Sequence, residues 1–118
     1  MNILLAIRWR DLRLAIDLFL REEPGINVVG VAAETESLLA LHETTHPHVV
    51  LLDWDLPGRA IPEVLRTIHT ATNPPKLIVL GNHEIEKDIA LEAGADAFVV
   101  KGEPPQQLVA AIRQINPL

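Results

Sequence analysis

The chain has 118 residues, with 10 Lys+Arg against 16 Asp+Glu, which gives a formal net charge of −6 at pH 7. We expect one domain over residues 1–118, long enough to bury a core without disulfides. The absence of cysteine excludes a disulfide framework, a thiolate zinc site and a cysteine nucleophile. The acidic balance argues against direct contact with nucleic acid or an anionic membrane surface. No apolar run approaches the roughly 18 residues of a membrane span, so we expect a soluble, cytoplasmic domain.

Five short apolar runs recur along the chain and predict the strands of one sheet. They cover residues 3–7, 26–31, 49–52, 77–80 and 97–100. Four of the runs are unbroken and all contain β-branched residues, which is typical of strands buried on both faces of a parallel sheet. We therefore expect a parallel sheet covered by other elements on both sides.

The stretches between these runs have the periodicity of amphipathic helices. In the first stretch, Leu12, Ile16 and Phe19 share one face. The apolar stripe of the last stretch consists of Leu108, Ile112 and Ile115. Gly94 stands where a helix C-cap glycine belongs, and Pro105 suits the start of the final helix. The alternation of strands and helices predicts an α/β fold, a doubly wound parallel sheet with helices on both faces.

In a doubly wound sheet, the binding crevice lies at the carboxyl ends of the strands, near the point where the strand order reverses. For the strand order 2-1-3-4-5, the crevice is lined by the residues that follow the first, third, fourth and fifth strands. These residues are Arg8, Trp9, Arg10, Asp53, Trp54, Asp55, Gly81, Asn82, His83, Lys101 and Gly102. Any chemical function is expected there.

The stretch 47–58 reads PHVVLLDWDLPG and resembles the third strand and following loop of response-regulator receiver domains, with their phospho-acceptor aspartate. Residues 77–81 and 93–102 are similar to the family's fourth strand and to the run that leads into its lysine. The resemblance covers all 118 residues and is strongest for receivers that precede a helix-turn-helix output domain. It implies a flavodoxin-like (βα)5 three-layer sandwich with strand order 2-1-3-4-5.

The resemblance also implies roles for individual residues of the crevice. Asp53 matches the phospho-acceptor, Lys101 the lysine, and Phe98 the mobile aromatic residue of the switch. The family's acidic pair falls on Ile7 and Arg8. Three groups of the family's machinery are therefore present, and the metal-binding pair is not.

Gly81 stands at the position where the family has a Thr or Ser. In the family, this hydroxyl binds a phosphoryl oxygen and moves with it while the aromatic residue rotates. Mg²⁺ commonly uses one or two carboxylates, whereas Arg8 is a cation. At an effective dielectric constant of about 20, two unit charges about 4 Å apart interact by roughly 4 kcal/mol, so tight Mg²⁺ binding is not expected.

The resemblance and these departures together predict an atypical receiver, or pseudo-receiver. It is expected not to be an enzyme, to need no metal or cofactor, and to act in signal transduction and transcription regulation through phosphorylation-independent protein–protein contact. One alternative is a conventional receiver that a histidine kinase phosphorylates weakly on Asp53. Another is a small enzyme or ligand-binding domain that reuses the crevice around Asp53, Arg8 and Lys101.

The charged residues are expected to divide between the crevice and the surface. The cations Arg8, Arg10 and Lys101 belong to the crevice, and acids such as Glu86 belong to the surface. We expect the Arg8 guanidinium to pair with Asp53, with Lys101 as a second cation. In the alternative, Arg8 points to solvent and only Lys101 contacts Asp53.

The two tryptophans, Trp9 and Trp54, flank the same crevice. They are candidates for a cap over Asp53 or for an aromatic platform that a partner contacts. The alternative is one partly buried and one exposed tryptophan without a role.

Three histidines, at positions 42, 46 and 48, suggest a metal site by their spacing. No cysteine or Glu-x-x-His companion completes such a site, so we expect surface histidines and no metal.

Leu14 and Leu18 lie on the side of the first predicted helix opposite its core stripe. Together with Leu108 and Ile112 of the last helix, they are the candidate interface for a protein partner or a homodimer through helices one and five. The alternative is scattered surface leucines.

Overall fold

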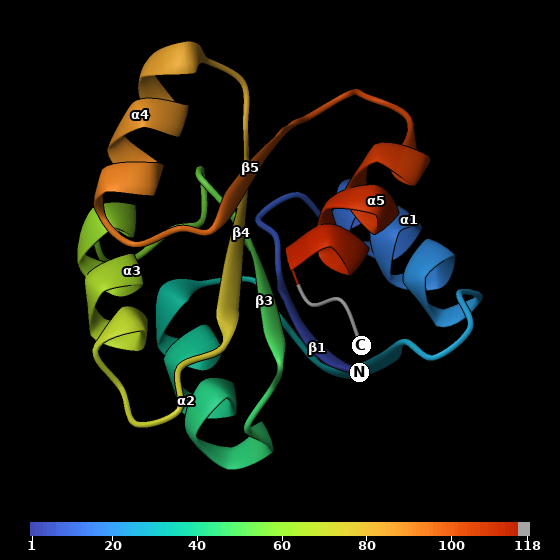
Figure 1. Ribbon diagram of the computed structural model, residues 1–118, viewed down its shortest axis with the longest axis horizontal. Helices are drawn as coiled ribbons and strands as arrows, with labels where there is room; N and C mark the ends of the chain where they lie inside the picture. Colours follow the sequence, from blue (N-terminus) through green and yellow to red (C-terminus); the bar gives the residue numbers. More distant parts are fainter. Residues whose placement is uncertain (116–118) are drawn as a thin grey trace.

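The computed structural model describes residues 1–115, and residues 116–118 of the predicted domain lie outside this range (Figure 1). The described chain forms a five-stranded parallel sheet with the order β2-β1-β3-β4-β5. The elements are β1 (Asn2–Ala6), α1 (Arg10–Arg21), β2 (Asn27–Ala32), α2 (Thr35–Thr45), β3 (Val49–Asp53), α3 (Ile61–His69), β4 (Lys76–Gly81), α4 (Glu84–Glu92), β5 (Ala97–Val100) and α5 (Pro105–Ile115). The predicted fold class and strand order are confirmed.

The sheet separates two layers of helices, with α1 and α5 on one face and α2, α3 and α4 on the other (Figure 1). Alternate residues of the inner strands point to opposite faces. Leu4 and Val50 belong to the core cluster under α2, α3 and α4, whereas Ile3 and Val49 belong to the cluster under α1 and α5. This arrangement is the three-layer sandwich that the resemblance implies.

The inner strands β1, β3 and β4 are buried almost throughout, as their apolar runs predict. The edge strands β2 and β5 are only partly covered, and Val31 and Val100 are exposed. The expectation of burial on both faces is therefore wrong for these two strands. An edge strand has a neighbour on one side only, so the flanking helices protect it less well.

The helix ends follow the predicted punctuation. Gly94 comes directly after the C-cap of α4 with a φ of +116°, a value that an L-residue with a side chain adopts only under strain. Pro105 is the first residue of α5. Within residues 1–115, none of the helices combines the length and apolar character needed to cross a membrane.

Two residues of the candidate interface belong to the core instead. Leu108 and Ile112 of α5 are buried in the cluster beneath α1 and α5. Their prediction as interface residues is wrong, because the i, i+4 stripe on which they lie is the stripe that seats α5 on the sheet. Leu14 and Leu18 of α1 are 45% and 65% exposed, so the prediction that they face away from the core is confirmed.

Candidate functional site

Asp53 is the last residue of β3 and its side chain is fully buried. Its Oδ2 atom accepts a hydrogen bond from the Arg8 backbone N–H at 3.0 Å. Its Oδ1 atom accepts one from the Asp55 backbone N–H at 2.9 Å and pairs with Lys101 Nζ at 2.5 Å. Both carboxylate oxygens therefore have partners, as a buried charge requires.

Lys101 follows β5 and links two carboxylates. Its Nζ atom lies 2.5 Å from Asp53 Oδ1 and 2.9 Å from Asp55 Oδ2, and its side chain is 12% exposed. Its backbone N–H donates to the Gly81 carbonyl oxygen at 2.8 Å, which fixes the loop after β5 against β4. Burial alone would lower the pKa of Lys101, but the hydrogen bonds and charges of Asp53 and Asp55 outweigh burial and raise this pKa.

The expected ion pair between the Arg8 guanidinium and Asp53 is not formed. Arg8 is exposed, and its guanidinium lies over the Trp9 ring, 4.6 Å from the ring centroid. Arg8 contacts the Asp53 carboxylate through its backbone N–H and not through its side chain. The physical reason is that Lys101 and two backbone N–H groups already satisfy Asp53, whereas stacking on an exposed ring leaves the Arg8 cation hydrated.

A cation that sequence reasoning missed lies beside the end of β1. The Arg13 guanidinium donates to the carbonyl oxygens of Ile7 and Arg8 at 2.9 and 3.1 Å. It therefore fixes the backbone that presents the Arg8 N–H to Asp53. The sequence signal is only an arginine in the first helical turns after β1, which by itself favours a surface position.

The two tryptophans have different surroundings. Trp9 is 55% exposed, whereas Trp54 is partly buried against the core cluster under α2, α3 and α4. The Trp54 backbone N–H donates to the Leu80 carbonyl oxygen at 2.8 Å, which joins the ends of β3 and β4. The two side chains therefore do not share one environment: Trp54 is partly buried and Trp9 is exposed, as in the second of the two arrangements expected from the sequence.

The end of β4 is filled by side chains from two other elements. A Cβ atom at Gly81 would lie 2.6 Å from Phe98 Cζ and 2.6 Å from Glu86 Oε1. Glu86 Oε1 also accepts the backbone N–H groups of Asn82 and His83 at 2.8 and 3.3 Å. Glu86 was expected at the surface; the signal that could have found it is its place three residues after the N-cap of α4, where a glutamate bonds back to the cap.

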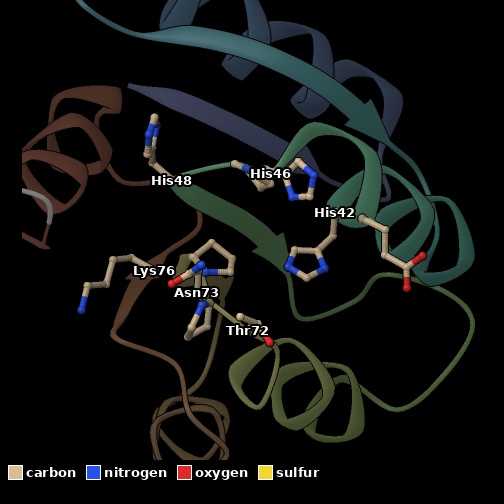
Figure 2. A pocket seen from close by; sticks show the side chains of 10 residues that line it. His42, His46, His48, Thr72, Asn73 and Lys76 are labelled. Carbon is tan, nitrogen blue, oxygen red and sulfur yellow. The ribbon is translucent and has the colours of Figure 1, made fainter.

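His42, His46 and His48 lie around a cleft of about 700 Å³ near the amino ends of β3 and β4, whereas Asp53 lies at the carboxyl end of β3 (Figure 2). His48 points away from His42, and its Nδ1 atom accepts the Asn2 backbone N–H at 2.8 Å. Burial lowers the pKa of His42. Across residues 1–115, no three His, Cys, Asp or Glu side chains are grouped so that they could hold a metal ion.

The chain is similar in sequence to curated response regulators. The chain is 31% identical over 105 residues to the nitrate/nitrite response regulator protein NarL of Escherichia coli K12, covering 87% of this chain and 49% of NarL. It is 34% identical over 116 residues to the response regulator UvrY of the same organism, covering 97% of this chain and 53% of UvrY. The chain therefore spans about half the length of the curated relatives it matches.

A solved structure shows the same fold. The signal receiver domain of the putative response regulator NarL from Mycobacterium tuberculosis superposes with a TM-score of 0.90 at 22% identity, covering 97% of this chain and 94% of that one. The model of the response regulator receiver domain family matches residues 9–113. On the crevice, the relatives and this match, the chain belongs to the response regulator receiver domain family and is a signalling module of two-component systems.

Proposed function

We propose that this receiver signals through protein–protein contacts that do not depend on phosphorylation of Asp53. The observation that carries the proposal is the composition of the crevice, where Ile7 and Arg8 stand at the positions of the family's acidic pair and Gly81 at that of its hydroxyl residue. Asp53 is buried, and Lys101 and two backbone N–H groups satisfy its carboxylate. A nucleophilic carboxylate must instead reach a phosphodonor.

The donor set of the crevice does not fit the Mg²⁺ ion that receiver chemistry uses. Mg²⁺ takes near-octahedral oxygen ligands and commonly one or two carboxylates. The acidic pair of the family falls on Ile7, which is buried, and Arg8, which is a cation. The remaining carboxylates, Asp53 and Asp55, share the ammonium group of Lys101.

A conventional receiver, weakly phosphorylated on Asp53 by a histidine kinase, is the second candidate function. The observation that favours it is the contact between Lys101 and Asp53, since both groups match the family pattern. This candidate requires Lys101 to transfer from two carboxylates to a phosphoryl group. No other cationic side chain among residues 1–115 pairs with Asp53.

The partners of this module are other proteins. Because the matched relatives are response regulators about twice as long, we expect the receiver to act in transcription regulation together with an output domain. The receiver itself carries a net charge of −6 and is not expected to contact DNA. A homodimer through α1 would use Leu14 and Leu18, whose side chains are exposed. Because the chain belongs to the receiver domains of two-component signalling, we also expect it to act in the cytoplasm.

Treatment with acetyl phosphate, with and without Mg²⁺, tests the proposed function. We expect no phosphoryl adduct in the intact mass of the wild type, with Asp53→Asn as the control for labelling elsewhere. Arg8→Asp supplies one carboxylate at an exposed position of the missing pair, and we expect it to gain Mg²⁺-dependent labelling. Mg²⁺-dependent labelling of the wild type that Asp53→Asn abolishes would establish the conventional receiver instead.

A further inference from the structure

Gly81, at the end of β4, is a glycine that its backbone does not require. Its φ is not in the left-handed region, so conformational freedom does not explain the residue. Available space does explain it. A Cβ atom there would lie 2.6 and 2.8 Å from the Phe98 ring and 2.6 Å from Glu86 Oε1, all well inside van der Waals contact. Two side chains, from β5 and α4, already occupy the volume of a side chain at position 81.

Glu86 is held in this position by backbone donors. Its Oε1 atom accepts the N–H groups of Asn82 and His83, which precede α4. The N-terminus of a helix also favours a negative charge through its dipole. The carboxylate therefore has a fixed place beside Gly81.

Phe98 is partly buried and packs against the core cluster under α2, α3 and α4. In the sheet it pairs with Val79, yet its ring reaches Gly81, two residues farther along β4. The same residue lines a cleft of about 340 Å³ that also involves Lys87 of α4 and Gln107 of α5. The position of this ring therefore shapes the surface between α4 and α5.

We propose that Gly81, Phe98 and Glu86 form a latch that holds the switch aromatic in one position whatever the state of Asp53. In the receivers that this chain resembles, a hydroxyl side chain at position 81 moves and the aromatic residue rotates. Here the ring fills the space of that side chain, so the two cannot coexist. The latch deepens the proposed function and rests on it, because a receiver that signals without phosphorylation must present its contact surface permanently.

Fluorine NMR tests the latch, because the chain contains only two phenylalanines, Phe19 and Phe98. With 4-fluorophenylalanine incorporated, Phe98→Leu assigns the two resonances. We expect Gly81→Ser to shift the Phe98 resonance and to leave that of Phe19 in place. The matched control is Gly30→Ser in β2, where a Cβ atom would meet a Leu4 methyl group and not a phenylalanine. We expect this control to leave the Phe98 resonance unchanged.

A melting experiment keeps the test informative if Gly81→Ser folds poorly. Overpacking by one side chain lowers the Tm of a domain of this size by on the order of 5–10 °C. In the double variant Gly81→Ser/Phe98→Leu, the smaller side chain at position 98 makes room for the serine. We therefore expect the double variant to have a higher Tm than the single variant Gly81→Ser. An unmoved Phe98 resonance in Gly81→Ser, or no recovery of Tm in the double variant, overturns the latch.

The same spectra separate failure of the latch from failure of the proposed function. If acetyl phosphate labels Asp53 while the Phe98 resonance stays in place, the proposed function is wrong and the latch stands. If the Phe98 resonance moves when Asp53 is labelled, the latch is wrong.

Discussion

The two halves of the crevice are ordered by different forces. At the ends of β3 and β5, charge dominates, because Lys101 neutralises the buried Asp53. At the ends of β1 and β4, shape dominates, because Ile7 is buried in the core and the Phe98 ring fills the space beside Gly81. The ionic half matches the family pattern, whereas the other half keeps the aromatic residue Phe98 and departs from the pattern at Ile7, Arg8 and Gly81.

The difference shows why part of a catalytic pattern persists without its companions. A buried carboxylate without a partner costs several kcal/mol, so Asp53 and Lys101 depend on each other whether or not phosphoryl chemistry takes place. The groups of the other half do not depend on one another in this way, because the buried Ile7, the exposed Arg8 and Gly81 take the places of the acidic pair and the hydroxyl without leaving a buried charge unpaired. The ion pair is thus a structural element in its own right.

Removal of the lysine should have the largest effect. Lys101→Met leaves Asp53 buried without a counter-charge, and we expect the free energy of unfolding to fall by about 3–5 kcal/mol. Urea unfolding measures this change. Lys76→Met, at an exposed position of β4 that forms no ion pair among residues 1–115, is the matched control and should change little. A loss below about 1 kcal/mol for Lys101→Met, the range of exposed ion pairs, would show that the ionic half is not structural.

The ion pairs of Lys101 should also make the free energy of unfolding depend on pH, with a smaller change than removal of the lysine causes. Because the pKa of Lys101 is raised in the folded protein, its ion pairs stabilise the fold fully below the ordinary lysine pKa. This stabilisation is lost as the pH rises through the higher folded-state pKa. We expect the free energy of unfolding to decrease in alkaline solution more steeply for the wild type than for Lys101→Met. Parallel curves for the two proteins would contradict the raised pKa.

The other half of the crevice should respond to loss of the Glu86 carboxylate. Glu86→Ala removes the acceptor of two backbone N–H groups before α4, and we expect a loss of about 1 kcal/mol, typical of a helix cap. Glu84→Ala, in the exposed first position of the same helix, is the control and should cost less. Equal losses for the two variants would mean that Glu86 acts only through its charge near the helix end.

Exposed leucines of α1 should affect assembly and leave stability almost unchanged. The double variant Leu14→Glu/Leu18→Glu should halve the mass measured by light scattering if α1 forms the homodimer interface. We expect its free energy of unfolding as a monomer to change by no more than about 0.5 kcal/mol for each exposed position. An unchanged mass would end the proposal of an α1 interface.

Arg8 should give the smallest change. Because its guanidinium contacts the Trp9 ring at the surface and not Asp53, we expect Arg8→Ala to alter stability by no more than about 0.5 kcal/mol. A loss of several kcal/mol in urea unfolding would instead indicate a hidden ion pair with Asp53.

Most of the fold was predictable from the sequence, because buried parallel strands leave unbroken apolar runs and the helices leave stripes at spacing i, i+4. The edges were not, since a run such as 97–100 reads the same in a central strand and in the edge strand β5. The stripe of Leu108 and Ile112 was assigned correctly to a helix face, but its second assignment to an interface was wrong because one stripe cannot face both the sheet and a partner.

The candidate site was predictable where motifs define it, as with Asp53 and Lys101. Side-chain direction was not predictable. Position 8 is beside Asp53 in the chain's topology, yet only its backbone makes the contact. Glu86 was missed although its place three residues after the N-cap of α4 favours a bond back to the cap, because that place does not show that the carboxylate also lies beside Gly81.

Titration with Mg²⁺, followed in ¹H–¹⁵N NMR spectra, tests most directly whether the crevice is complete without a metal. The backbone N–H groups of Arg8 and Asp55 bond to Asp53 and report on its carboxylate. The account predicts no saturable shift of these two resonances at millimolar Mg²⁺, in the wild type or in Asp53→Asn. Saturable shifts of both resonances in the wild type that disappear in Asp53→Asn would contradict it.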